Sequence, residues 1–218
     1  SNLAVIFGVA IASAVLVGSL LVGDSVRGSL RDVAVEQLGR VDHTLVAPRF
    51  FREELAADLA GDLGKDTSLD LLEPAIIMRG SVQAADERAP AARVNVLGVR
   101  EGFWRFGDEK PGPLPSGREA LLNKKLAEQL QVNGGGAVLL RLPSRANAPM
   151  DTAFGRRDLQ DTLKSMRLSV SGVVEGGMEN FSLRNDEPRP RNIYVSLEWL
   201  QKRFDRPEGA NVILVVST

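Results

Sequence analysis

The sequence has no cysteine, one histidine, and nearly balanced charge, with 27 basic against 28 acidic residues among 218. The lack of cysteine excludes disulfides, a thiolate zinc site and a cysteine nucleophile. The single histidine, His43, excludes a site with two histidine ligands, and its alternating strand-like setting predicts a packed or half-exposed side chain. The absence of a basic cluster argues against a nucleic-acid partner.

Motifs for catalysis or nucleotide binding are also missing. There is no G-x-S-x-G sequence, and the acidic residues are scattered rather than paired for acid/base chemistry. The glycine-rich stretch Asn133–Gly136 lacks the Gly-Lys-Ser/Thr of a phosphate loop and precedes a strand pattern, so it is read as a turn. We therefore predict no catalytic residue, no cofactor-binding residue and no metal ligand, and the chain is not expected to be an enzyme.

Charge is absent from residues 1–23, which hold 16 apolar residues, three glycines and four small polar residues. The uncharged run from Leu3 to Gly23 would form a helix about 31 Å long, which matches the hydrocarbon thickness of a bilayer. A transmembrane helix over residues 1–23 is the leading interpretation. A buried core helix and a cleavable signal peptide, for which Ala12-Ser13-Ala14 supplies a small-x-small sequence, are the alternatives.

Small residues recur every four positions along this segment. Ala10, Ala14 and Gly18 fall on one side of a helix, where they would let a second helix approach closely. We predict a helix-packing face at these three residues, although membrane helices are rich in alanine and glycine in general. Such a face implies that other transmembrane helices pack against this one.

The helical pattern continues beyond the apolar segment. Val26, Leu30, Val33 and Leu38 recur near one side of a helix, and Gly39 is a plausible stop. We predict a stalk helix over residues 24–40 that continues the membrane span as one rigid lever.

Strand and helix patterns alternate in the remainder without a strict βαβ rhythm, which predicts an α+β domain of two small lobes. Helices are expected over Leu55–Leu63 and from Ser196 to Phe204. Ser116 and Glu119 resemble a capping box, predicting a third helix with Leu122, Leu126 and Leu130 on its buried face. No internal repeat is evident. Strands are expected over 41–47, 76–82, 94–99, 137–142, 168–174, 192–197 and 210–217.

Three aromatic residues follow the third expected strand. Phe103, Trp104 and Phe106 would form a partner patch if they were exposed, since exposed aromatic residues serve as interface anchors. The other interpretation is that they cap a core.

Several segments, in order, resemble the MacB-like periplasmic core domain of FtsX-like ABC transporter permeases. They are the span that leads through Gly23-Asp24-Ser25-Val26-Arg27 into a helix, the sequence EALLNKKLAEQLQVNGGGAVLLRL, and the series RLSVSGVVEGG, NIYVSLEWLQKRF and ANVILVV. The chain departs from the family pattern at Gly135 or Gly136, where the family often has aspartate, and at Ser196, where it often has proline.

The resemblance implies an extracytoplasmic domain with a split porter-like lobe, residues 41–100 and 189–218, and an inserted lobe over 101–188. It also implies a cytoplasmic ABC ATPase that binds ATP, further transmembrane helices, a second permease copy, and a periplasmic adaptor or lipoprotein as partners. The chain would lie in the inner (plasma) membrane with its soluble domain in the periplasm. It would transmit ATP-driven conformational change for export or lipoprotein release.

A second hypothesis from another class remains. A single membrane span could anchor an extracytoplasmic sensor, adhesion or ligand-binding module, which predicts a signalling domain or nothing beyond the span.

Overall fold

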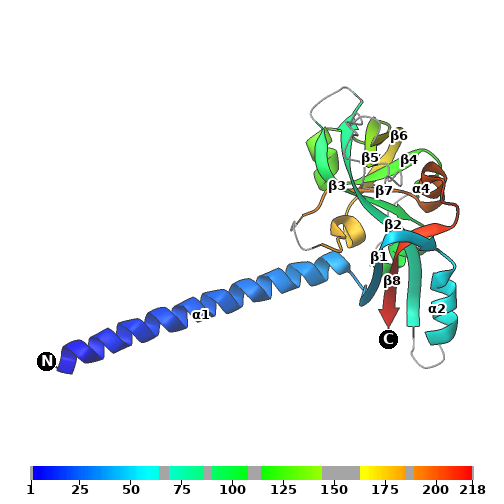
Figure 1. The fold of residues 1–218 in the computed structure, drawn as a ribbon. Helices are drawn as coiled ribbons and strands as arrows, with labels where there is room; N and C mark the ends of the chain where they lie inside the picture. Colours follow the sequence, from blue (N-terminus) through cyan, green and yellow to red (C-terminus); the bar gives the residue numbers. More distant parts are fainter. Residues whose placement is uncertain are drawn as a thin grey trace, which may run out of the picture. The chain divides into compact units, whose positions relative to one another are not determined.

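The computed structural model describes residues 2–63, 69–85, 90–107, 114–143, 163–184 and 189–217 (Figure 1). Contacts divide the chain into two compact units, Ser1–Gln37 and Leu38–Thr218. The first unit is formed by the helix α1 and the second, here called the outer domain, contains all of the strands.

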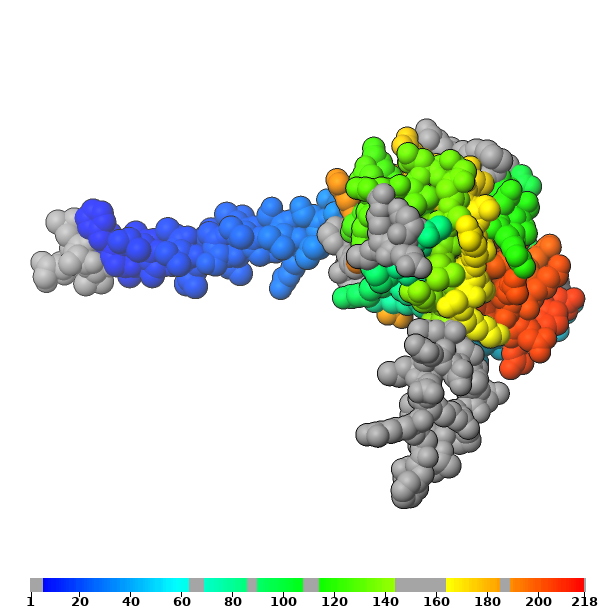
Figure 2. All heavy atoms as spheres, turned by 90° about the horizontal axis from the view of Figure 1, so that it is seen from above, coloured from blue at the N-terminus to red at the C-terminus, as the bar shows by residue number. Residues whose placement is uncertain are grey.

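Helix α1 (Asn2–Leu38) is one uninterrupted helix of 37 residues, so the predicted span and stalk form a single element. Most of its large apolar side chains, from Ile6 to Val35, are more than half exposed (Figure 2). From Ile6 onward it is the one helix among the described residues that is long and apolar enough to cross a membrane. Gly39 follows with a φ of +59°, which confirms the predicted stop in the left-handed conformation that favours glycine.

The outer domain is a mixed α+β structure, as predicted. Its elements, which include two short 3₁₀ helices labelled η, are β1 (His43–Arg52), α2 (Leu55–Leu63), β2 (Leu69–Ala84), β3 (Ala91–Val99), η1 (Glu101–Phe106), β4 (Glu119–Asn123), α3 (Lys124–Leu130), β5 (Ala137–Pro143), β6 (Leu163–Val174), η2 (Gly177–Asn180), β7 (Asn192–Ser196), α4 (Leu197–Phe204) and β8 (Gly209–Ser217).

Six of the strands close into a barrel. The order β2-β3-β7-β4-β6-β5 returns to its start because β5 also pairs with the second half of β2. Side chains alternate across each strand, so one set fills the barrel and the other faces outward. In β4, for example, Ala120 and Leu122 join the inner core, whereas Leu121 joins an outer one. The described strands of the barrel therefore leave no open edge within the ring.

Helices α3 and α4 complete the inner core. Leu126 and Leu130 of α3, and Leu197 and Leu200 of α4, are buried with the inward side chains of the strands. The α4 N-cap is Ser196, whose side chain accepts from the Trp199 N–H, as predicted. On one face of the domain, β5, β6 and α4 lie next to one another (Figure 2).

The barrel has an internal two-fold symmetry that the sequence does not reveal. The units β2-β3-β4-α3 and β5-β6-β7-α4 correspond: each begins with an antiparallel pair, and each third strand lies parallel to the second strand of the other unit. Strands β4 and β7 pair antiparallel where the two units meet, with Leu121 opposite Tyr194. Asn123 and Ser196 have the same role, since each caps the helix that follows.

Outside the barrel, β8 pairs with both β1 and the first half of β2 to form a three-stranded sheet. The outer core, which is the second cluster of buried apolar side chains, lies against this three-stranded sheet. It contains Leu71, Val212 and Leu214 together with side chains of η1 and η2. The long strand β2 belongs to both structures, because Leu69–Ala75 pairs with β8 and Ile76–Ala84 pairs with β3 and β5.

The structure corrects one helix prediction. Ser116 and Glu119 do interact, since the Ser116 N–H and hydroxyl both donate to the Glu119 carboxylate, but this pair lies in a turn before the strand β4. The helix begins five residues later, at Lys124, where the Asn123 side chain accepts from the Leu126 N–H at 3.2 Å. Thus Leu122 lies in a strand and only Leu126 and Leu130 lie on the helix.

The division of the domain into two lobes stays a prediction, and both predicted parts contribute strands to one strand order. Strands β1, β8, β2, β3 and β7 come from residues 41–100 and 189–218, and the adjoining β4, β6 and β5 come from 101–188.

Buried amide groups join the two halves of the barrel. The Asn192 side chain donates to the carbonyls of Glu179 and Phe181 at 3.0 and 2.9 Å, and its carbonyl accepts from Asn95 at 3.1 Å. The Asn192 N–H donates to the Asn123 side chain at 3.0 Å. Because the Asn123 and Asn192 side chains are fully buried, the loss of these hydrogen bonds would leave buried polar groups unsatisfied.

Asn192→Leu should therefore lower the free energy of unfolding by about 3 kcal/mol, since it keeps a similar volume but leaves buried carbonyls unpaired. Denaturant unfolding followed by tryptophan fluorescence measures this, because both tryptophans, Trp104 and Trp199, lie in the outer domain. Asn133→Leu, at an exposed turn, is the control and should change stability by less than about 0.5 kcal/mol. Equal effects of the two substitutions would contradict the network's role.

Candidate functional site

The most distinctive site of the outer domain is the place where its first and last described residues meet, here called the junction and formed by residues 38–42 and 215–217. Leu38 packs against the outer core, and the Arg40 N–H donates to the Phe106 carbonyl at 2.9 Å. The Arg40 guanidinium also donates to Asp70 at 2.6 Å. The first residues of the domain are thus attached to η1 and to the start of β2.

The end of β8 lies beside these residues. The Asp42 N–H donates to the Val215 carbonyl at 3.0 Å, and the Ser217 N–H donates to the Asp42 carboxylate, also at 3.0 Å. The Ser217 hydroxyl is 3.3 Å from the same carboxylate oxygen. The two ends of the domain are therefore hydrogen-bonded to each other, and His43 pairs with Val215 at the start of the β1–β8 ladder.

Gly39 is required at the junction for two reasons. Its φ of +59° disfavours any residue with a Cβ atom. In addition, a Cβ atom there would lie 2.6 Å from the Phe106 carbonyl oxygen and 3.1 Å from the Met178 sulfur. The backbone therefore passes η1 more closely than a side chain permits.

The aromatic residues Phe103, Trp104 and Phe106 are buried, with at most 1% of each exposed, so the prediction of a partner patch is corrected. They lie on η1, which places their rings in the outer core. Phe103 meets the rings of Trp104 and Phe181 edge-on, with centroids 5.2 and 5.3 Å apart. Their role is to support η1, whose Phe106 carbonyl receives the Arg40 N–H at the junction.

The predicted helix-packing residues Ala10, Ala14 and Gly18 lie on α1 at successive positions four residues apart. A Cβ atom added at Gly18 would have no described atom within 4 Å, so space for a close neighbour exists there. Whether a partner helix occupies this face stays a prediction.

The described residues contain no group of three histidine or acidic side chains that could hold a metal ion. His43 lies at the exposed start of β1 and pairs across the ladder with Val215. The prediction that catalytic, cofactor-binding and metal-ligating residues are absent stays a prediction.

One carboxylate close to η1 has a shifted pKa. Burial raises the pKa of Glu73, a residue of β2, and the nearby Arg100 and Arg105 guanidinium groups oppose this shift only in part. Arg100 is itself held by the Glu53 carboxylate at 2.6 Å, and Gln201 donates to the other Glu53 oxygen at 2.7 Å. The domain thus holds a desolvated carboxylate close to the segment that supports the junction.

Sequence reasoning found Gly39 but missed Asp42 and Ser217, which are 175 positions apart. An aspartate before a strand, such as Asp42, does not indicate from the sequence which distant residue it will bind. The only available hint was the alternating pattern near both ends of the domain, which predicts strands without predicting that they pair.

No family model matches the sequence, and the search of curated proteins found no match. Among solved structures, the extracellular domain of YknZ, a noncanonic ABC-type transporter from Gram-positive bacteria, is similar with a TM-score of 0.47 and 16% identity, over 80% of this chain and 83% of that one. The periplasmic region of MacB from Actinobacillus actinomycetemcomitans is similar with a TM-score of 0.47 and 14% identity, over 84% and 78%. The chain is similar to a MacB periplasmic region.

Gly39→Ala should destabilise the outer domain by about 2–4 kcal/mol, because it combines a strained φ with a collision at the Phe106 carbonyl. Gly28→Ala is the matched control: Gly28 lies within α1 and has no described atom within 4 Å of an added Cβ. Unfolding followed by tryptophan fluorescence should respond to the first substitution only. If Gly39→Ala has the same free energy of unfolding as the parent protein, the close approach of Gly39 to η1 does not constrain the residue at this position.

Glu73→Gln should stabilise the domain increasingly as the pH rises from about 4 to neutrality. Because the folded state raises the pKa of Glu73 above its ordinary value of 4.5, the folded chain binds the proton more tightly than the unfolded chain. The resulting stabilisation is complete at low pH and is lost as the pH rises through the raised pKa. Glutamine cannot ionise and so avoids this loss. Unfolding free energies measured across pH test this, with Glu54→Gln, at a side chain 65% exposed, as the control.

Proposed function

We propose that this chain is a transmembrane helix and the outer domain of an ABC transporter permease, which transmits ATP-driven motion across the membrane and performs no chemistry itself. The observation that carries the proposal is the junction. The Asp42 N–H is bonded to the Val215 carbonyl, and the Asp42 carboxylate to the Ser217 N–H, so the chain enters and leaves the domain at one place.

This arrangement suits a domain inserted between two membrane spans. A chain that enters from a spanning helix and must return to the membrane needs its second end near its first. A ligand-binding module on a single anchor has no such requirement. The proposal therefore expects a second apolar span soon after β8.

Helix α1 supports a mechanical role. Its uncharged part is long enough for the bilayer, at about 31 Å, and the whole helix extends about 55 Å at 1.5 Å per residue. An uninterrupted helix carries a displacement along its axis, whereas a flexible linker absorbs it. The hydrogen bonds of Arg40 and Asp42 then pass this displacement to η1 and β8.

The proposal assigns ATP binding and hydrolysis to a cytoplasmic ABC ATPase. The partners within the membrane are further spans and a second permease copy, which would pack on Ala10, Ala14 and Gly18. The outer domain would lie in the periplasm and contact an adaptor or a lipoprotein. The membrane is the inner (plasma) membrane, and the motion would serve export or lipoprotein release.

Two measurements test this function. The gene should encode further apolar spans after Thr218, and the full protein should copurify with an ABC ATPase. A cysteine placed at the exposed position Glu198 should react with a membrane-impermeant maleimide in intact cells, which is a clean readout because the chain has no native cysteine. A stop codon shortly after Thr218, or labelling only after permeabilisation, would overturn the proposal.

The packing face is tested by adding bulk to one side of α1. Ala14→Leu should reduce recovery of the assembled permease by at least about tenfold, because close helix approach needs small residues. Ala12→Leu introduces the same change about 160° around the helix and should leave assembly intact. Copurification of two differently tagged copies measures the effect, and equal losses for both variants would contradict a face at Ala10, Ala14 and Gly18.

A further inference from the structure

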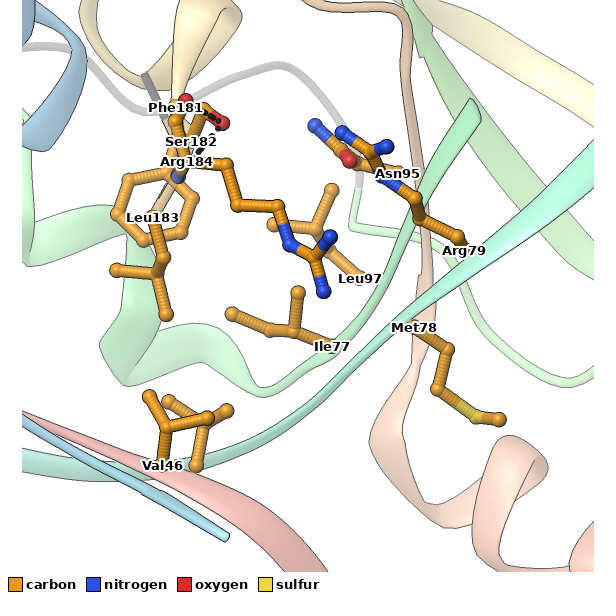
Figure 3. A pocket seen from close by; sticks show the side chains of 11 residues that line it. Val46, Ile77, Met78, Arg79, Asn95, Leu97, Phe181, Ser182, Leu183 and Arg184 are labelled. Carbon is orange, nitrogen blue, oxygen red and sulfur yellow. Dashed lines mark hydrogen bonds between the residues drawn. The ribbon is translucent and has the colours of Figure 1, made fainter. Parts of the chain in front are cut away.

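A cavity of about 150 Å³ opens on the outer side of the barrel, among β1, β2, β3, β8 and the segment Phe181–Arg184 (Figure 3). Neither the junction nor the mechanical role proposed above uses it. All of its lining residues belong to the outer domain.

Neighbouring strands form its wall through pairs of residues that lie opposite one another. Ile77 pairs with Leu97, and two positions further along the same strands Arg79 pairs with Asn95. Because side chains two residues apart lie on the same face of a strand, an apolar pair and a polar pair line the cavity together. Val46, which pairs with Val212, adds apolar surface from the β1–β8 ladder.

The wall is held in place before any ligand binds. The Asn211 side chain accepts from the Ile77 N–H at 2.8 Å and donates to the Ile77 carbonyl at 3.0 Å, which fastens β8 to β2 at the cavity. Such bonds fix the strands where β2 passes from the three-stranded sheet into the barrel. A preformed wall lowers the conformational cost of binding.

The opposite side is the segment from Phe181 to Arg184, which is anchored to the barrel at Phe181 and held by internal hydrogen bonds between Ser182 and Arg184. The Phe181 carbonyl accepts from Asn192 at 2.9 Å, and the Phe181 ring packs edge-on against Phe103. The Ser182 hydroxyl accepts from the Arg184 N–H at 3.1 Å and donates to the Arg184 carbonyl at 2.8 Å. Figure 3 shows the Arg184 side chain extending from this segment into the cavity.

The charge of the lining is one-sided. Two arginines, Arg79 and Arg184, and the Asn95 amide line the cavity, whereas none of its described lining residues is acidic. A guanidinium group binds a carboxylate through a planar pair of N–H donors, and such a pair is stronger where water is partly excluded. The apolar lining requires the remainder of the ligand to be apolar.

We propose that this cavity binds a small amphipathic organic acid. Its carboxylate lies toward Arg184, and its apolar body contacts Val46, Ile77 and Leu97. The volume limits that body to about the size of a benzene ring, because a cavity of about 150 Å³ accommodates benzene in a protein core. Binding at this site does not depend on the proposed transport role.

The test uses the full chain in lipid nanodiscs and the probe 4-fluorobenzoate, observed by ¹⁹F NMR, with empty nanodiscs as the blank. We expect saturable binding that weakens at least tenfold for 4-fluorobenzyl alcohol, which keeps the ring but lacks the charge. Acetate, which keeps the charge but lacks an apolar body, should compete at least tenfold more weakly than benzoate. Binding of the alcohol as tight as that of the acid, or no saturable binding, would overturn the proposal.

Two variants locate the site. Arg184→Gln should weaken 4-fluorobenzoate binding at least tenfold, whereas Arg206→Gln, at an exposed arginine outside the lining, should leave it unchanged. Val46→Phe should narrow the cavity from its exposed side and abolish binding without disturbing the core, since Val46 is 58% exposed. Tryptophan-monitored unfolding confirms that each variant is folded. A folded Val46→Phe protein that binds like the parent would place the ligand elsewhere and refute the proposal.

Discussion

The pairing of β2 with three partners is the constraint on which the outer domain depends. Its first half completes the sheet with β8, and its second half both starts and closes the barrel through β3 and β5. Two cores therefore share one strand, and the Asn211 bonds at Ile77 secure the point where it changes partners. A shift of one residue in β2 would move apolar side chains to the wrong face of both structures at once.

The junction and the cavity lie on elements that this strand organises. Asp70, near the start of β2, accepts from the Arg40 guanidinium, and Arg79, in the second half of β2, lines the cavity. The buried η1 connects these regions, because its rings fill the outer core while its last carbonyl receives the Arg40 N–H. Support for the chain ends and for a binding surface thus comes from the same packed aromatic side chains.

Local patterns predicted the local elements well. The long helix, its stop at Gly39, the helix Leu55–Leu63 and the Ser196 cap follow from short-range spacing and backbone preference. The strand β4 was mistaken for a helix because leucines at 122, 126 and 130 keep helical spacing across the Asn123 cap. Pairing partners such as Asp42 and Ser217, and the two-fold symmetry, depend on register between distant segments, which composition and periodicity do not encode.

The joined chain ends also determine how the domain responds to force. When two antiparallel strands are pulled apart from adjacent ends, their hydrogen bonds break one at a time. When both ends are pulled in the same direction, the strands move together and these hydrogen bonds are not loaded. The β1–β8 ladder begins at His43 and Val215, beside both ends of the domain, so a force applied at Asp42 and Ser217 would act on it from adjacent ends. The domain would then move as a rigid body when its two attachments travel together and would begin to unzip when they separate.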